Sequence, residues 1–331
     1  MVNMSHRVQN LSIKLRAPWF ALLLLLMAQH SLGAPSAKDL LASGHVDEVI
    51  RMLNEQIARA PSDAEAYNLL CRAHYMIEEW DPGIAACERA VNLDPHSSLY
   101  ALWLGRIYGE KADRSGFMTA ASLAKKARAS FERAVELDPG NVQARADLGE
   151  FYAEAPAIIG GGKDKARQQA EALMFLNPAM GHWVLARIAE KDKDPALAER
   201  EYRAEIAASR GGVRGWLDLA NFLKYAHRYD EMEEALLQME SAPVDHPESI
   251  MHAGSLLLRA ERNYPLATRF LRRYLAAPVE DGPACRAHNL LGLVLEKQGN
   301  RQGAVEEFRA ALALAHAYAH AQQDLKRLEH S

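Results

Sequence analysis

The stretches CERAVNLDP, at residues 87–95, and FERAVELDP, at residues 131–139, decide the fold of this chain of 331 residues. A looser copy, FRAALALAH, lies at residues 308–316. A second motif, Leu-Gly followed three residues later by a large side chain, recurs in LWLGRIY (102–108), ADLGEFY (146–152) and NLLGLVL (289–295). Self-similarity of this kind is the signature of a repeat architecture.

The chemistry of these motifs indicates paired helices. Hydrophobic residues make up 49% of the chain and Ala is abundant, while β-branched runs are scarce, so we expect helices and almost no strand. Small residues allow two helices to approach closely, and the Pro that follows each second helix prevents its continuation. One such pair cannot bury its apolar face alone, so several must stack. The small residues are Gly105, Gly149, Ala220 and Gly292.

The pattern resembles the tetratricopeptide repeat, whose unit is a pair of antiparallel helices of about 34 residues. Pro61 and Pro95 are 34 residues apart, and the unit between them carries residues typical of the family. The resemblance implies an all-α fold, a right-handed α-solenoid over residues 34–331 with about eight helix pairs. The first unit, at residues 37–63, has a shortened leading helix, and residues 318–329 form a polar closing helix. As a function, the resemblance implies a protein-interaction scaffold and not an enzyme.

The N-terminus is typical of a secretory signal peptide over residues 1–33. Basic residues without acidic ones precede the apolar run APWFALLLLLMA (17–28), and small residues follow it. Cleavage after Gly33 fits this pattern, and we expect a periplasmic or secreted protein of a bacterial cell envelope. The alternative is an N-terminal membrane anchor, although the run is shorter than the about 20 residues that span a bilayer.

The charge of the chain bears on its partners. The formal net charge is −4, and removal of residues 1–33 takes away Arg7, Lys14 and Arg16, which leaves 36 basic and 43 acidic residues and a net charge of −7. Because binding to phosphates requires a concentrated basic surface, a nucleic-acid partner is not expected. An anionic membrane surface is disfavoured for the same reason, and no membrane span remains after removal of the signal.

The stretch APAIIGGGKDKA, at residues 155–166, resembles a phosphate-binding loop only superficially. A Walker loop follows a strand, and its Lys is followed by Ser or Thr, whereas a helix is expected before this run and Asp164 follows Lys163. We therefore expect a connection between two helices, with the glycines permitting turns. The alternative function, an enzyme or small-molecule receptor, would use the loop at residues 160–163.

The resemblance places the first helix of each unit on a concave surface. The position two residues after each unit's Leu, or after Ala253 in the seventh unit, is then occupied by Arg72, Arg106, Glu150, Arg187, Asn221, Ser255 and Leu293. The flanking positions hold Asn68, Tyr75, Arg214 and Lys224. Arg side chains and amides along one groove predict binding of a protein or peptide, such as an acidic segment or a chain terminus. The alternative is a solvated groove with salt bridges between helices. The residues predicted to bind the partner are Asn68, Arg72, Tyr75, Arg106, Arg187, Arg214, Asn221 and Lys224.

Cys71 and Cys87 stand at facing levels of the two helices of one unit, and an exported protein meets an oxidising compartment, so we expect a disulfide between them. The alternative is two reduced cysteines in the core. Cys285 remains unpaired. Only His316 and His320 share a helix face at a spacing of four, which favours a solvated face over a metal site. No cofactor, metal or catalytic residue is expected.

Two insertions interrupt adjacent units, at residues 109–121 and 156–162. Both fall between the first and second helix of their unit, so both should emerge on the same edge. The first insertion should lengthen the helix that follows it. Apolar residues, Phe117 and Met118 in one and Ile158 and Ile159 in the other, predict that the two tips pack together. Apolar area left exposed would mark a second binding surface.

Overall fold

The computed structural model describes residues 35–277 and 283–330. The predicted signal peptide and its cleavage site after Gly33 lie outside these residues, as does the alternative of an N-terminal anchor. In the described part of the chain all regular structure is helical, with seventeen α-helices and one short 3-10 helix, η1. The elements are α2 (Ala37–Ala42), α3 (Val46–Arg59), α4 (Ala64–Met76), α5 (Trp80–Leu93), α6 (Ser98–Asp113), α7 (Phe117–Leu137), α8 (Val142–Glu154), η1 (Ala157–Ile159), α9 (Lys163–Leu176), α10 (Pro178–Lys191), α11 (Pro195–Ala208), α12 (Val213–Tyr225), α13 (Tyr229–Glu240), α14 (Glu248–Ala260), α15 (Tyr264–Leu275), α16 (Ala284–Lys297), α17 (Arg301–Leu314) and α18 (Ala319–Glu329).

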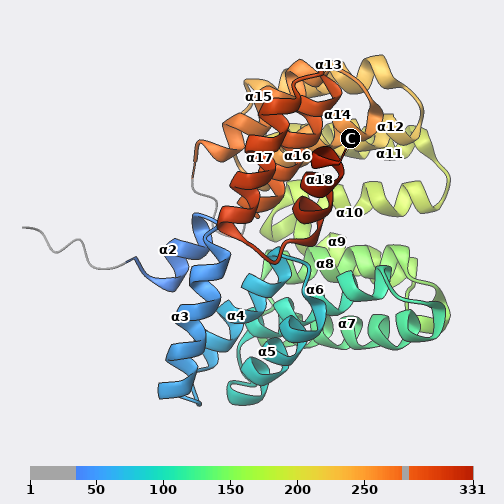
Figure 1. Ribbon diagram of the computed structural model, residues 1–331. Coiled ribbons are helices and arrows are strands. Elements are labelled where there is room, and N and C mark those ends of the chain that lie inside the picture. The colour runs from blue at the N-terminus through green and yellow to red at the C-terminus, as the bar shows by residue number, and fades with distance from the viewer. Residues whose placement is uncertain (1–34, 278–282, 331) are drawn as a thin grey trace, which may run out of the picture. The chain divides into compact units, whose positions relative to one another are not determined.

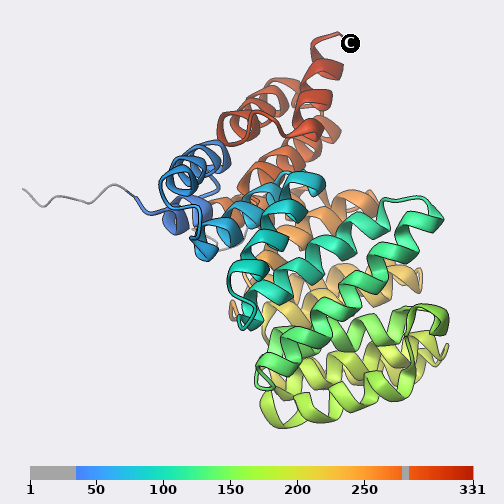
Figure 2. The same ribbon diagram turned by 90° about the horizontal axis from the view of Figure 1, so that it is seen from below.

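Consecutive helices pair along the chain from α2–α3 to α16–α17, and α18 closes the array (Figures 1 and 2). Most first helices also pack on the first helix of the next pair, as α8 does on α10 and α12 on α14. The fold is therefore the all-α solenoid of stacked helix pairs that the sequence predicts, with a short leading helix α2 and a closing helix α18.

Local sequence sets the helix boundaries. The side chains of Asp63, Ser97 and Asn141 each accept a hydrogen bond from a backbone N–H three residues on, and so begin α4, α6 and α8. Asn177 caps α10 in the same way and Pro178 occupies its first turn, where a missing N–H costs nothing. These turns are short because an N-capping residue begins the next helix soon after the preceding helix ends.

The first helices of the array contact the last ones. Leu41 and Val46 belong to the same buried cluster as Ala315 and Tyr318. The backbone N–H of His316 donates to Asp47 over 2.9 Å, and the His316 ring lies 2.8 Å from the same carboxylate. His316 lies in the turn between α17 and α18, whereas His320 lies in α18, so the predicted common helix face is wrong. Both rings are exposed, and His320 also lies 3.3 Å from Glu78. Both histidines thus join the end of the array to its beginning.

Cys71 of α4 and Cys87 of α5 form a disulfide, which confirms the predicted pair. Their Cα atoms are 5.2 Å apart, and both side chains are buried. The bond fastens the two helices of the second unit at facing levels. Cys285 of α16 is unpaired and buried, and burial raises the pKa of its thiol to about 12.

The two insertions differ from expectation in one respect. The first does lengthen the following helix, since α7 begins at Phe117 and has 21 residues. However, Phe117, Met118 and Ile158 are 85%, 80% and 85% exposed, so the predicted packing of the two tips is wrong. The second insertion is instead held against α7 by a polar contact, in which Arg128 donates to the carbonyl of Ile159 over 3.1 Å. The apolar tips are left facing solvent.

Candidate functional site

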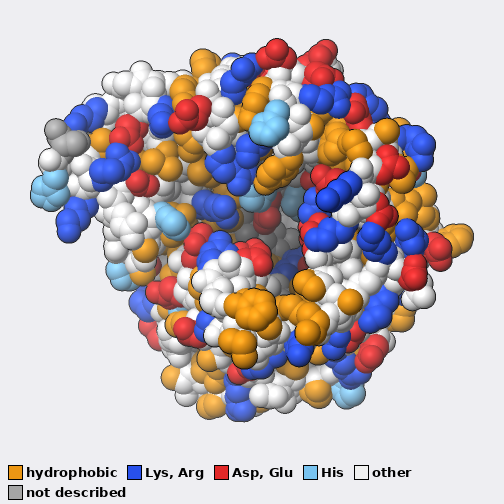
Figure 3. Space-filling view, turned by 90° about the vertical axis from the view of Figure 1, so that its right-hand side faces the viewer, with side chains coloured by type: hydrophobic (Ala, Val, Ile, Leu, Met, Phe, Trp, Pro, Cys, Tyr) orange, Lys and Arg blue, Asp and Glu red, His pale blue; other side chains and the backbone are white. Residues whose placement is uncertain are grey.

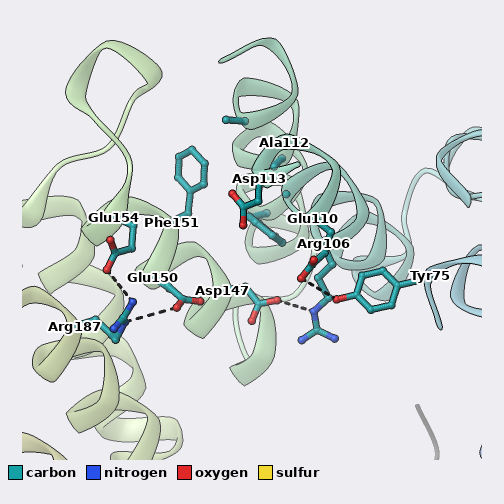
Figure 4. Close-up of a pocket in the computed structure, with 14 residues that line it drawn as sticks. Tyr75, Arg106, Glu110, Ala112, Asp113, Asp147, Glu150, Phe151, Glu154 and Arg187 are labelled. Carbon is teal, nitrogen blue, oxygen red and sulfur yellow. Dashed lines mark hydrogen bonds and ion pairs between the residues drawn. The ribbon is translucent and has the colours of Figure 1, made fainter. Parts of the chain in front are cut away.

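The first helices of four units line a cavity of about 660 Å³, here called the central cavity (Figure 4). Tyr75 of α4, Arg106 of α6, and Arg187 of α10 are the predicted site residues that it brings together. The periodicity of the repeat places them there, because equivalent positions of successive first helices face the same side. The structure therefore assembles part of the predicted set in one place.

Arg106 links α6 to α8. Its Nε donates to Asp147 over 2.7 Å, and its guanidinium lies over the Trp103 ring, 5.1 Å from the centroid. Trp103 also packs edge to face with Tyr75, whose hydroxyl donates to Glu110 over 3.3 Å. Burial raises the pKa of Tyr75, so the hydroxyl stays protonated and remains a donor. These contacts fix one wall of the cavity.

Arg187 holds the opposite wall, between α8 and α10. It donates to Glu154 over 2.9 Å, lies 3.7 Å from Glu150, and also pairs with Glu190. Burial raises the pKa of Glu150 to about 7, although the positive charge of Arg187 acts in the opposite direction. At neutral pH the positive charge of Arg187 therefore offsets only part of the effect of burial on the Glu150 carboxyl.

A second cavity of about 450 Å³ continues the central one, and the two share Arg106 and Asp147. Arg214, at the start of α12, lines the second cavity. The guanidinium of Arg214 lies over the Trp183 ring, and the Nε of Arg214 is 3.6 Å from a carboxylate oxygen of Asp218. The backbone N–H of Arg214 donates to Asp245 over 3.2 Å. Together the two cavities form a groove, defined here as the surface from Tyr75 of α4 to Arg214 of α12.

Two acidic side chains lie beneath this second cavity. Glu205 of α11 is 1% exposed, and neither its Oε2 nor Oδ2 of Asp218 accepts a hydrogen bond from a described residue. Burial and then the negative charge of Asp218 raise the pKa of Glu205 well above its ordinary value. A proton shared by the pair would satisfy both oxygens. Nearby, burial lowers the pKa of His246 to about 4, so this ring is neutral at pH 7.

The other predicted site residues do not line the two cavities. Asn68 and Arg72 of α4 are buried, and the Arg72 guanidinium lies over the Trp103 ring at 5.2 Å from the centroid. Asn221 donates back to the carbonyl of Leu217, and the ammonium of Lys224 lies over the Tyr225 ring. These four residues contribute to packing and to the helix surface, and a role for them in binding stays a prediction.

Apart from Glu150, which the repeat register already places on the concave surface, the carboxyl groups of the site were not predicted from the sequence. The central cavity is lined by two guanidinium groups, on Arg106 and Arg187, and by five carboxyl groups. The carboxyl groups belong to Glu110, Asp113, Asp147, Glu150 and Glu154. Residues three or four positions from an inward-facing residue share its helix face, so Glu110 follows from Arg106, and Asp147 and Glu154 follow from Glu150. The alternative of salt bridges between helices along the groove describes Arg106 and Arg187, whereas Arg214 pairs with Asp218 within α12.

A third cavity, of about 330 Å³, lies between the two insertions and is here called the rim cavity. Phe117, Ala121 and Ile159 contribute to its apolar wall, and Asp113 and Glu154 line both this cavity and the central one. In Figure 4 the Phe151 ring has Glu154 on one side and Asp113 on the other. Figure 3 shows a hollow surrounded by basic and acidic side chains, with hydrophobic side chains gathered on the edge below it.

The glycine run forms no phosphate-binding cradle. The N–H groups of Gly160, Gly161 and Gly162 donate to the carbonyls of Ala157, Pro156 and Tyr152, respectively, at 2.9–3.2 Å. Gly160 adopts a φ of +100°, which explains the need for glycine there. The ammonium of Lys163 pairs with Asp192. The run is a connection between α8 and α9, as expected.

Within residues 35–277 and 283–330, no three His, Cys, Asp or Glu side chains lie close enough together to hold a metal ion. No helix in that part of the chain has the length and apolarity required to cross a membrane.

The fold and the groove define a class, the helical-repeat α-solenoids. Two family models described as tetratricopeptide repeat match the chain, over residues 36–108 and 286–318. These matches show tetratricopeptide repeats toward the two ends of one continuous array of helix pairs. Such repeats support a role as a scaffold for protein–protein interaction. The comparison with curated proteins finds no match.

Solved structures share the fold at low identity. Yeast Tom70 is 16% identical with a TM-score of 0.52, over 86% of this chain and 58% of that one. The Cut9–Hcn1 hetero-tetramer of the APC/C is 16% identical with a TM-score of 0.39, over 88% of this chain and 54% of the other. A thermophilic TPR protein of Thermus thermophilus is 16% identical with a TM-score of 0.47, over 57% of this chain and 99% of that one. The chain thus spans less than two thirds of the length of the first two structures.

Proposed function

We propose that this protein is an exported scaffold that binds an extended segment of a partner protein in the groove between α4 and α12. The observation that carries this proposal is the continuity of the groove. The central and second cavities share Arg106 and Asp147, so one ligand can contact residues of α4, α6, α8, α10 and α12 at once. Extended segments use such repeated, equivalent positions for recognition.

An acidic segment or a chain terminus is one form of this ligand. Arg106 and Arg214 line the second cavity, and the raised pKa of Glu205 removes one competing negative charge there. A carboxylate entering this cavity would share Arg106 with Asp147 and Arg214 with Asp218. Guanidinium groups have five donors, so a second acceptor can be accommodated without breaking the first contact.

We further propose that the protein acts in a bacterial cell envelope. The support is the signal-like segment at residues 1–33. The Cys71–Cys87 disulfide agrees with this location, because such bonds persist in oxidising compartments. A scaffold also fits a fold and family that are typically non-enzymatic.

The test is a comparison of captured partners. Affinity capture from an envelope extract would use the mature chain, an Arg106→Ala/Arg214→Ala variant, and an Arg133→Ala control whose side chain lies on α7 outside both cavities. A groove partner should be retained by the wild type and the control and lost from the double variant, at a temperature below the measured melting temperature of all three proteins. Identical partners for all three proteins would overturn the groove as the binding site.

A further inference from the structure

The rim cavity and the central cavity are continuous. Five residues line both: Ala112, Asp113, Ala124, Phe151 and Glu154. On the rim side the wall is mainly apolar, whereas on the central side carboxyl groups predominate. A ligand that passes from one to the other therefore meets an apolar surface and then an acidic one.

From this arrangement we infer that the composite pocket binds a segment of a partner protein in which a large apolar side chain is followed closely by Lys or Arg. The inference rests on the proposed function and specifies the ligand at one end of the groove. A cavity of about 330 Å³ is at the lower end of the range for ligand pockets, which suits a single aromatic or long aliphatic side chain.

The apolar part of the argument depends on exposure. Phe117 and Met118 of α7 and Ile158 of η1 are large hydrophobic side chains that nothing in the described chain covers. Scattered exposed hydrophobic residues are ordinary, but these lie at the two insertions, and the rim cavity separates the insertions. Contact with an apolar side chain would remove part of this area from water.

The charged part depends on complementarity. Arg106 pairs with Asp147, and Arg187 pairs with Glu150 and Glu154, so the two guanidinium groups of the central cavity face five carboxyl groups in all. Asp113 is exposed, makes no ion pair with a described residue, and lies where the two cavities meet. Partial burial and the neighbouring Glu110 raise the pKa of Asp113, although the positive charge of Arg114 acts in the opposite direction. A Lys or Arg of a partner would supply a further cation.

The experiment is selection from a random heptapeptide library displayed on phage, against the mature chain. The expected consensus is an aromatic or long aliphatic residue followed within three positions by Lys or Arg. The affinity of a synthetic peptide of that consensus should fall about threefold to fivefold in Asp113→Asn, the size expected of one partly exposed ion pair. In Phe117→Ser it should fall by about fivefold, through loss of apolar contact.

Two matched controls separate these effects from general changes of the surface. Phe175→Ser removes an equally exposed ring, 92% accessible on α9, and Glu171→Gln removes an exposed carboxylate of the same helix. Neither residue lines a cavity of the groove or rim, so both variants should bind the peptide like the wild type.

The outcomes distinguish this inference from the proposed function. Enrichment of acidic peptides that respond to Arg214→Ala and not to Asp113→Asn would overturn the inference and support the groove. Loss of self-association in Phe117→Ser would also overturn it, since a second copy of the chain would then be the occupant. Failure to select any peptide sensitive to groove or rim variants would count against both.

Discussion

Gly105 of α6 lies directly against the ring of Phe131 in α7, so that a β-carbon at Gly105 would be 2.5 Å from the ring. Gly292 and Phe308 have the same relationship in α16 and α17. The Leu-Gly motif and the aromatic residue of the next helix are thus two halves of one contact. This contact sets the separation of the two helices in a unit.

Gly105→Ala should destabilise the protein by about 1–3 kcal/mol, because the added methyl group overpacks the contact with Phe131. Gly109→Ala, in the same helix, is the matched control, since nothing lies within 4 Å of a β-carbon there. Ala has the higher helix propensity, so this control should stabilise by up to about 1 kcal/mol. Urea unfolding of the three proteins measures both effects. Equal effects of the two substitutions would contradict the role of the Gly105–Phe131 contact.

Glu205→Gln should reduce the loss of stability that accompanies rising pH. The pKa of the Glu205 carboxyl is higher in the folded chain than in the unfolded chain, so the folded chain binds more protons. Glu205 therefore contributes to the free energy of unfolding at low pH. That contribution is lost as the pH rises from the unfolded value of about 4.3 through the folded value. The variant should therefore be more stable than the wild type at neutral pH, and the difference should shrink toward pH 4.

The free energy of unfolding, measured in urea between about pH 4 and pH 8, checks this prediction. Glu171→Gln, on an exposed face, is the control and should run parallel to the wild type. Parallel curves for Glu205→Gln and the wild type would mean that Glu205 does not hold a proton in the folded protein.

Loss of the Cys71–Cys87 bond should lower the free energy of unfolding by about 3 kcal/mol, the value that the loop-entropy model gives for a short closed loop. Reductant should lower the Tm of the wild type and leave a Cys71→Ala/Cys87→Ala variant unchanged. Peptide mapping of unreduced protein provides the direct measurement. Recovery of both peptides with unmodified thiols would show that the bond does not form in the cell.

The exported protein should begin at Ala34. Intact-mass measurement on protein from a periplasmic or culture fraction would detect the loss of residues 1–33, including Arg7, Lys14 and Arg16. A Gly33→Arg substitution should block processing, because cleavage requires small residues near the site. A full-length mass in the membrane fraction of the unsubstituted protein would favour the alternative of an N-terminal anchor.

The units could be predicted from the sequence because each helix pair is a local structure with residues at fixed spacing. Gly105, Phe131 and Pro139 belong to one such unit. The carboxyl groups of the central cavity other than Glu150 were harder to foresee, because whether Asp147 faces inward depends on small rotations of α8. The packing of the two insertion tips was predicted wrongly because hydrophobicity alone does not set side-chain direction at the first turn of a helix.

The contact of Asp47 with His316 joins residues 269 positions apart, and it has a consequence for how the array unfolds. In an open stack each terminal unit has one neighbour, so opening starts at the ends and spreads inward. Here α3 and the segment that precedes α18 cover each other, and neither end is without a neighbour. The two ends of the array therefore stabilise each other. A destabilising substitution in α3 should first increase the rate of amide hydrogen exchange in α18.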